Sequence, residues 1–239
     1  MINGTVADVG LRVAQHQPIP IFIERGENFI GARRRGNMSS MDTHSRTPVP
    51  ISTPIACYVS GKGMHATNAT WNFKTLIIAT LGASGLGYDT RYRYYEPRFP
   101  SMAPAALARL ICDPIEYYDS EWPAYWQSHG GDETRAATAF MLERDKLFQR
   151  EARVAVYCYD EAGFGSGVNS VRFLEAGKPI LGFYHEQQRS PTLNLSNILQ
   201  LELEYPRLFT LRSYRNADDI APQLTAWLSA RAAQAAGPG

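Results

Sequence analysis

The chain has 239 residues, of which 44% are apolar, and its formal net charge at pH 7 is +1. This apolar content supports a packed core and excludes global disorder, while the near-zero charge gives no electrostatic basis for binding nucleic acid or an anionic membrane surface. Because no apolar run is long enough to span a bilayer and the N-terminus has no signal-peptide pattern, we expect a cytoplasmic protein with no membrane contact.

The first part of the chain differs in composition from the rest. It contains three consecutive arginines at 33–35 and a segment rich in Ser, Thr and Pro from Ser39 to Pro54. This composition predicts an N-terminal extension or linker over residues 1–54, followed by one α/β domain over residues 55–239. Met38 and Met41 are candidate natural start positions.

The first elements of the domain follow from their apolar patterns. Ile55–Ser60 is a short apolar run and predicts a strand, and Gly61–His65 is a glycine-containing turn. Residues 69–84 have apolar side chains at helical spacing, which predicts a helix packed on a sheet. Residues 88–95 are rich in β-formers and predict a second strand.

The stretch from Phe99 to Arg135 is irregular and rich in proline and aromatic residues. We predict one short helix within it, at 104–111. A loop of this length in an α/β domain is usually functional. We expect its aromatic side chains, including Trp122 and Trp126, either to meet a ligand or a partner subunit or to pack on one another. A helix is predicted at 138–151.

The segment from Arg153 to His185 is the centre of the prediction. It contains an apolar run at 154–159, a glycine-rich turn at 163–167, a helical pattern at 168–175 and a second apolar run at 180–184. Neither run alternates, as expected for strands covered on both faces. The segment predicts a strand, a turn, a helix and a parallel strand, with a ligand site where the first strand meets the turn.

The remaining pattern completes the expected fold. It predicts a helix at 193–204, a strand at 208–213 and a final helix that begins at Asn216 or Ala217 and ends near Ala235. About five strands alternate with helices. This order is typical of an α/β protein with a doubly wound parallel sheet and helices on both faces.

Glycine-rich turns after the first and third strands supply the candidate ligand-binding residues. Gly165, Ser166 and Gly167 would bring backbone N–H groups to a helix N-terminus, where they bind phosphate or a sugar hydroxyl, or else serve only a tight turn. Gly61 opens the first turn, where Lys62 and His65 would either neutralise a phosphate or remain solvated.

The three cysteines, at 57, 112 and 158, are an odd number and include no CxxC pair. This count argues against a disulfide framework or a metal site, and Cys57 and Cys158 are expected to be buried thiols within strands. We expect neither a metal nor an organic cofactor.

Several short motifs resemble one known family. They are Tyr58-Val59-Ser60-Gly61 at the first strand, Gly87-Tyr88, Asp145 before the third strand, and Gly165 to Asn169 followed by Gly177-Lys178-Pro179. In these motifs the chain resembles the nucleoside 2-deoxyribosyltransferase-like family from Ile55 to about Ala235. The resemblance implies a flavodoxin-like fold, a small-molecule nucleoside or nucleotide as substrate, and a homo-oligomer. It also implies cleavage or transfer at an N-glycosidic bond.

The sequence differs from the family at the position of its catalytic nucleophile. The spacing from Gly177 places Asn169 where the family has its nucleophilic glutamate, and an amide cannot form a glycosyl ester. The hypothesis is therefore hydrolysis by an activated water, with Tyr58, Asp145, Asp160 and Asn169 in the site and Asp145 or Asp160 as base. Asp160 would otherwise form a turn or cap a helix. The alternatives are a nucleotide-sensing module without catalysis and a TIR-like domain that processes NAD.

Overall fold

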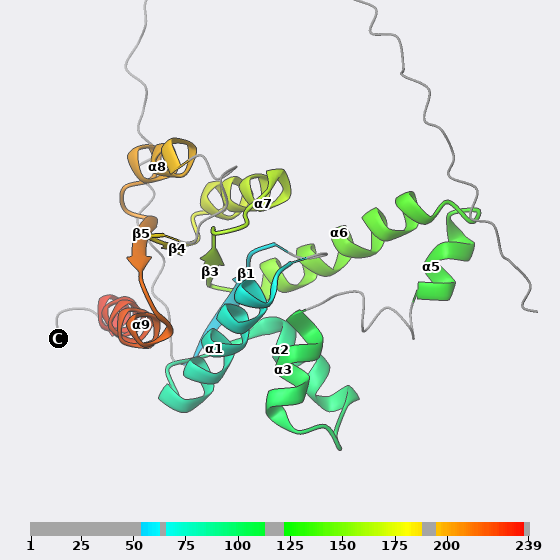
Figure 1. The fold of residues 1–239 in the computed structure, drawn as a ribbon, viewed down its shortest axis with the longest axis horizontal. Helices are drawn as coiled ribbons and strands as arrows, with labels where there is room; N and C mark the ends of the chain where they lie inside the picture. Colours follow the sequence, from blue (N-terminus) through cyan, green and yellow to red (C-terminus); the bar gives the residue numbers. More distant parts are fainter. Residues whose placement is uncertain (1–53, 63–65, 113–121, 188–194, 237–239) are drawn as a thin grey trace, which may run out of the picture. The chain divides into compact units, whose positions relative to one another are not determined.

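Five parallel strands form the sheet at the centre of the described structure (Figure 1). The computed structural model describes residues 54–62, 66–112, 122–187 and 195–236, which all belong to the second of two units of the chain, residues 42–239. The strand order is β2-β1-β3-β4-β5. The strands are β1 (Ile55–Ser60), β2 (Gly87–Asp89), β3 (Val154–Cys158), β4 (Ile180–His185) and β5 (Phe209–Tyr214). The predicted fold class is confirmed. Of the predicted extension, only Pro54 is described.

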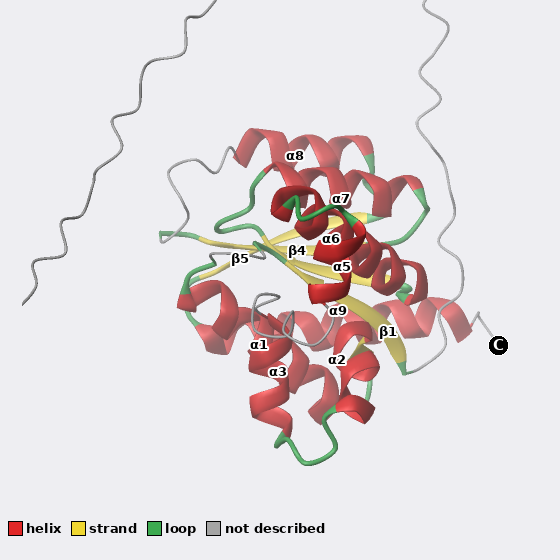
Figure 2. Cartoon of the chain, turned by 90° about the vertical axis from the view of Figure 1, so that its right-hand side faces the viewer, coloured by secondary structure: helices red, strands yellow, loops and turns green. Residues whose placement is uncertain are grey.

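Helices connect these strands and cover both faces of the sheet (Figure 2). α1 and α9 pack on one face, and α6, α7 and α8 pack on the other. The helices are α1 (Asn68–Ser84), α2 (Thr90–Tyr95), α3 (Pro104–Cys112), α5 (Trp122–Ser128), α6 (Glu133–Glu151), α7 (Phe164–Glu175), α8 (Leu195–Glu204) and α9 (Ile220–Ala236). Two 3₁₀ turns are Glu96–Arg98 and Ala217–Asp219.

β1 and β3 are buried along their whole length. This burial explains why apolar and polar residues do not alternate along them. Successive side chains still point to opposite faces. Cys57 and Cys158 pack in the apolar cluster beneath α1 and α9, whereas Tyr58 and Tyr157 belong to the cluster beneath α6 and α7. The cysteines are buried thiols, as predicted for these two strand positions.

The predicted second strand is wrong beyond Asp89. β2 ends there and α2 follows directly. The buried Asp89 carboxylate accepts the N–H of Tyr92 at 2.7 Å, which caps α2, and the N–H of Val59 in β1 at 3.0 Å. Burial raises the pKa of this carboxyl, against the attraction of Arg91 and the N–H donors. Capping by Asp89 therefore outweighs the β-propensity of the following tyrosines.

Two helices begin earlier than predicted. α6 begins at Glu133 because the Asp132 carboxylate accepts the N–H of Arg135 at 3.0 Å and caps it. α7 begins at Phe164, so most of the predicted glycine turn at 163–167 is helical. In the stretch predicted to be irregular, α3 confirms the short helix, α5 is an additional helix, and residues 113–121 lie outside the described residues.

The later elements follow the prediction closely. α8 and β5 correspond to the predicted helix and strand, although residues 193 and 194 lie outside the described residues. Asn216 caps the final helical segment, and its backbone N–H is accepted in return by Asp219. Within the described ranges, no helix is long and apolar enough to cross a membrane.

Gly182 in β4 packs closely against a buried ring on the α7 side of the sheet. A Cβ at this position would lie 2.5 Å from Cε2 of the buried Tyr159 ring, which also contacts Ser170 through its hydroxyl. We expect Gly182→Ala to lower the free energy of unfolding by about 2 kcal/mol, because the ring cannot move without disturbing the core. Urea denaturation followed by circular dichroism measures this change.

Gly82→Ala is the matched control, because nothing lies within 4 Å of a Cβ built at that helical position. It should raise the free energy of unfolding by about 0.5 kcal/mol. Equal effects of the two substitutions would show that the close approach of Tyr159 does not constrain Gly182.

Candidate functional site

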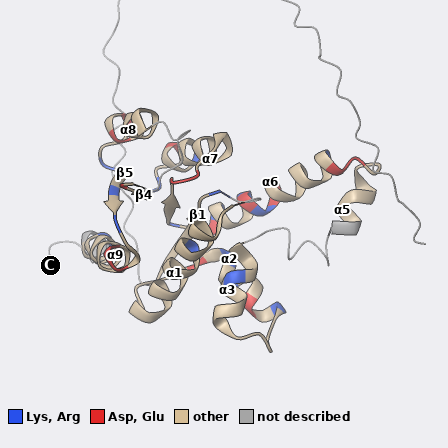
Figure 3. Cartoon of the chain, viewed as in Figure 1, with Lys and Arg blue, Asp and Glu red and all other residues tan. Residues whose placement is uncertain are grey.

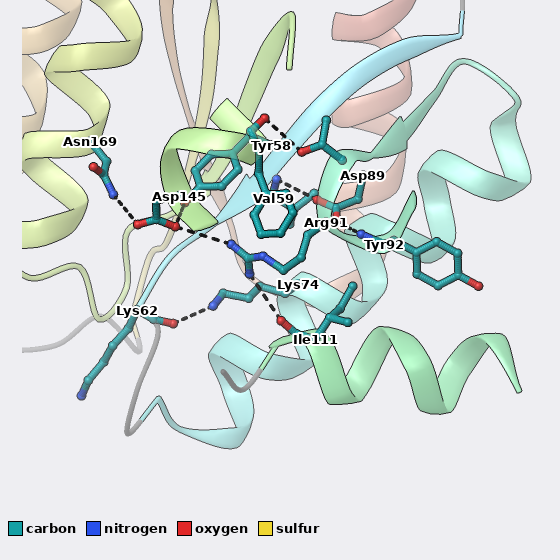
Figure 4. A network of polar contacts seen from close by, with 12 residues as sticks. Tyr58, Val59, Lys62, Lys74, Asp89, Arg91, Tyr92, Ile111, Asp145 and Asn169 are labelled. Carbon is teal, nitrogen blue, oxygen red and sulfur yellow. Dashed lines mark hydrogen bonds and ion pairs between the residues drawn. The ribbon is translucent and has the colours of Figure 1, made fainter. Parts of the chain in front are cut away.

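A cavity of about 230 Å³ lies at the carboxyl end of β1, where α6 and the start of α7 approach the strand (Figure 4). β2 lies on one side of β1, and β3, the next strand in the chain, lies on the other side. The cavity is therefore at the point where the strand order reverses, which is where such sheets bind ligands. We call it the Asp145 cavity. The predicted site residues that line it are Tyr58, Gly61, Lys62, Asp145, Gly165, Ser166 and Asn169.

The Asp145 carboxylate joins three elements around the cavity. Tyr58 in β1 donates its hydroxyl to Oδ1 at 2.7 Å, and Asn169 in α7 donates Nδ2 to Oδ2 at 3.1 Å. Arg91 in α2 places Nη2 4.0 Å from Oδ1. The side chain of Asp145 remains 20% exposed. The carboxylate is therefore held in place by donors and still faces the cavity.

Tyr58 is a fixed hydrogen-bond donor. The residue is only 1% exposed, and its ring stacks on Phe173 with a centroid distance of 6.3 Å. Burial raises the pKa of the Tyr58 hydroxyl strongly, and the negative charge of Asp145 raises it further. The hydroxyl therefore stays protonated at neutral pH and donates to the carboxylate.

Asn169 lies on the cavity side of α7, as the spacing from Gly177 predicted. Its amide donates to Asp145 and brings no negative charge of its own. Glu175 is the last residue of α7, at the end of the helix far from Gly163, and its side chain is exposed. α7 therefore contributes no carboxylate to the described lining of the cavity.

The first turn of α7 forms another wall of the cavity. Gly163 is the N-cap residue and makes no side-chain cap, while Gly165 and Ser166 follow in the helix. The N–H groups of a first helical turn have no acceptor within the helix and attract negative charge. Nothing lies within 4 Å of a Cβ built at Gly165, so this wall is open.

Gly61 is required by close packing beneath the cavity. A Cβ there would lie 3.2 Å from both the Cβ and the carbonyl oxygen of Cys158. A larger residue here would therefore have to displace Cys158 in β3. The neighbouring candidate His65 lies outside the described residues.

The structure does not bring Asp160 to the Asp145 cavity. Its buried carboxylate accepts the N–H of His185 at 2.5 Å and the hydroxyl of Tyr214. Asp160 therefore connects the end of β3 to β4 and β5 through hydrogen bonds. Its neighbour Glu161 accepts the N–H of Thr67 at 3.0 Å and the hydroxyl of Thr70 at 2.6 Å, which anchors the start of α1.

Gly167 faces away from the other glycines. It lines a separate groove between α7 and α8, with Val171 and Leu201. A helix turns by about 100° per residue, so neighbouring positions of its first turn face different surroundings. The predicted turn would have brought Gly165, Ser166 and Gly167 to the same ligand. Because the segment is helical, Gly165 and Ser166 face the Asp145 cavity and Gly167 faces the groove.

Sequence reasoning missed half of the cavity. The lining residues that were not singled out as candidates are Lys74, Arg91, Met141, Arg144 and Phe148, together with Ser60 and Gly163, which appeared only within a motif and a turn. Lys74 alone left a recognisable trace, because it shares a helix face with Phe73, Ile77 and Leu81, where a charge is unusual. Arg91 was assigned to the later part of the second strand, which is helical in the structure.

Lys74 is the most unusual of the missed residues. It is 2% exposed, and its Nζ donates to the carbonyl oxygen of Lys62 at 2.6 Å. Burial, and after it the positive charge of Arg91, lowers the pKa of its ammonium group from 10.5 to about 8. Among the residues described, no carboxylate pairs with it within 4.0 Å.

The described residues contain no group of three or more His, Cys, Asp or Glu side chains placed to hold a metal ion. The cavity instead combines one carboxylate, several cationic groups and a helix N-terminus. No protein-family model matches the sequence, and no curated protein matches it at a significant level of similarity.

We expect Lys74→Met to stabilise the fold at pH 7 by about 2 kcal/mol, because it removes a buried charge at the cost of one hydrogen bond. The folded-state pKa lies below that of the unfolded chain, so the charge destabilises the fold fully below pH 8. The gain should disappear as the pH rises from 8 through 10.5. Thermal unfolding of both proteins from pH 6 to pH 10.5 measures the difference.

Lys146→Met is the control, since Lys146 is exposed on α6. It should change the free energy of unfolding by less than about 0.5 kcal/mol at every pH. A Lys74→Met protein less stable than the wild type at pH 7 would contradict the proposed cost of burying the ammonium group.

Proposed function

We propose that the Asp145 cavity binds a nucleoside or nucleotide and that the protein cleaves its N-glycosidic bond. The observation that carries this proposal is a single carboxylate among the described lining residues, held by Tyr58 and Asn169 from two other elements. Such a carboxylate suits a reaction in which positive charge develops at the anomeric carbon of a sugar. The resemblance of the sequence motifs to nucleoside 2-deoxyribosyltransferases supports the same chemistry.

The volume of the cavity suits the sugar portion of this substrate. At about 230 Å³ it is smaller than the range of about 300–1,000 Å³ typical of sites for whole drug-sized ligands. The sugar would lie beside Asp145, and the base would extend toward the opening. The N–H groups at the start of α7 would meet a sugar hydroxyl or a phosphate.

The proposed step is attack of water on the anomeric carbon as the bond to the base breaks. Asp145 stabilises the oxocarbenium-like transition state and accepts a proton from the attacking water. Tyr58 and Asn169 fix the orientation of the carboxylate throughout. The base leaves with the electrons of the glycosidic bond and takes up a proton from solvent water, and Asp145 afterwards returns its proton to solvent. Because Asn169 cannot act as a nucleophile, no covalent glycosyl intermediate forms.

A second candidate is a nucleotide-binding module without turnover. The specific observation in its favour is Asn169, whose amide contacts the carboxylate at the position where the similar family has a second acid. A site with one carboxylate has no separate group to protonate the departing base. In this alternative, binding in the cavity changes the stability of the protein but releases no product.

Free-base release tests the catalytic proposal. The protein is incubated with ribo- and deoxyribonucleosides and their 5′-monophosphates, and the free base is quantified by liquid chromatography. We expect Asp145→Asn to lower kcat at least about 100-fold, because it removes the charge and the general base. Glu143→Gln on the same helix, which bonds Tyr125 outside the cavity, should leave kcat within about twofold. Base release that persists in Asp145→Asn would exclude the proposed role of Asp145.

Asn169→Glu separates the two candidates. A glutamate here would place a second carboxylate beside the sugar and permit a glycosyl ester, so we expect base release at least about tenfold faster than in the wild type. Asn169→Gln keeps a neutral amide and is the control for side-chain length. If the wild type binds a nucleotide and only the glutamate variant releases base, the second candidate is correct. Proteins that neither bind nor cleave would eliminate both.

A further inference from the structure

Lys74 is the only charged residue of α1, whereas acidic and basic residues are interspersed along α6 (Figure 3). It lies on the buried face of α1 with Phe73 and Ile77, and it is 2% exposed. A lysine this far from solvent loses the hydration of its ammonium group, which destabilises the fold. Such a residue is expected where its amine has a task that a solvated lysine cannot perform.

The side chain of Lys74 is held so that it lines the Asp145 cavity. A Cβ built at Gly61 would lie 3.4 Å from Cε of Lys74, so the glycine leaves room for the methylene stem. Nζ donates to the carbonyl oxygen of Lys62 at 2.6 Å. A neutral amine also has N–H donors, so this hydrogen bond persists when the ammonium group loses a proton. The carbonyl oxygen therefore fixes the nitrogen and leaves the lone pair of the neutral amine available.

The charges around Lys74 favour its neutral form. Asp145 already accepts two hydrogen bonds and lies 4.0 Å from Nη2 of Arg91. The guanidinium of Arg91 is also attracted to Asp89, so Arg91 has acidic partners of its own. Burial, and after it the positive charge of Arg91, lowers the pKa of Lys74, and the attraction of Asp145 opposes them more weakly.

An amine in these surroundings is a nucleophile near neutral pH. With a pKa of about 8, about a tenth of the Lys74 side chains are neutral at pH 7, against fewer than about one in a thousand for a lysine at 10.5. Desolvation and a neighbouring cation are two ways in which proteins activate a lysine for attack on a carbonyl group. The electrophile has to be small, since the cavity has a volume of about 230 Å³.

We propose that Lys74 forms an imine with the open-chain aldehyde of a sugar held beside Asp145. The identity of the sugar rests on the proposed function, because hydrolysis of an N-glycosidic bond leaves a sugar whose ring opens to an aldehyde at C1. The reactive amine rests only on the place of Lys74 in the cavity and on its surroundings. Lys74 would then hold the sugar after its bond to the base has been broken.

The bond-forming step is attack of the neutral Lys74 nitrogen on C1 of the aldehyde. The nitrogen loses a proton as the carbonyl oxygen gains one, which gives a carbinolamine. The carbinolamine then loses its hydroxyl group and the remaining N–H proton as water, so that a C=N bond replaces the C=O bond. No oxidant or reductant takes part, and addition of water to the imine reverses the reaction.

Reductive trapping tests the proposal directly. The full-length protein is incubated at pH 7 with D-ribose or 2-deoxy-D-ribose, the imine is reduced with borohydride, and peptide mass mapping locates the resulting secondary amine. We expect the adduct at Lys74 to form at least about tenfold faster than the adduct at the exposed Lys146, because more of the Lys74 amine is neutral. Ribitol, which has no carbonyl group, should give no adduct. An adduct that forms no faster at Lys74 than at Lys146 overturns the proposal.

Two variants show whether the fast adduct depends on the amine. Lys74→Met removes the nitrogen, and Lys74→Arg keeps a positive charge but replaces the amine by a guanidinium that stays protonated. Both should lower the initial rate of sugar incorporation, measured by intact mass, at least about tenfold, and Lys146→Met should retain it. Thermal unfolding shows that each variant is folded. Fast incorporation in a folded Lys74 variant overturns the proposal.

A pH series separates Lys74 from a solvated lysine. The charged or ionisable groups around it are Tyr58 from β1, Lys62 after β1, Arg91 from α2, Cys112 from α3, Arg144 and Asp145 from α6, and Cys158 from β3. Burial raises the pKa of the tyrosine hydroxyl and of both thiols, so these groups stay predominantly neutral up to pH 9. The ratio of adduct at Lys74 to adduct at Lys146 should fall about tenfold from pH 7 to pH 9, because most of the Lys74 amine is neutral above about pH 8. A constant ratio would show that Lys74 titrates as an ordinary lysine and would overturn the proposal.

Failure of this inference and failure of the proposed function give different results. A fast adduct of the free sugar at Lys74, without base release from any nucleoside or nucleotide, would retain the reactive amine and reject the N-glycosidic reaction. Base release by the wild type, with no adduct at Lys74 after borohydride treatment, would retain the N-glycosidic reaction and reject the imine.

Discussion

A parallel sheet covered by helices on both faces can accept polar side chains only near the ends of its strands, and this constraint organises the structure. Three aspartates place their carboxylates there: Asp89 ends β2, Asp160 follows β3, and Asp145 reaches Tyr58 of β1 from α6. Asp89 accepts backbone N–H groups of β1 and α2, and Asp160 accepts donors from β4 and β5. Asp145 accepts side-chain donors from Tyr58 and Asn169. The first two connect elements of the fold, and the third faces a cavity.

The surroundings of Asp145 combine features that a purely structural ion pair would not need. A buried tyrosine holds the carboxylate on one side, and an amide holds it on the other. Lys74 and Arg91 lie close by with little exposure. Charged groups that a fold buries together beside a cavity are typical of functional sites.

The sequence could predict features that depend on near neighbours in the chain. The apolar runs at β1, β3 and β4 predicted a parallel sheet, and the spacing from Gly177 predicted that Asn169 would lie on the cavity side of α7. It could not predict α2, because the tyrosines after Asp89 favour a strand and only the capping carboxylate decides otherwise. It also misjudged Asp160, since a carboxylate after a strand serves a ligand or a neighbouring strand equally well until its partners are known.

By itself, the sequence determined the order of the five strands and of the longer helices, the glycines near the strand ends and the position of Asn169 relative to Gly177, because these follow from local periodicity and spacing. Only the tertiary structure decided which charges meet. Tyr58, Lys74, Arg91 and Asp145 come from β1, α1, α2 and α6, and no local pattern relates them. Their charges interact strongly only because the packed helices exclude water and bring them within a few ångströms of one another.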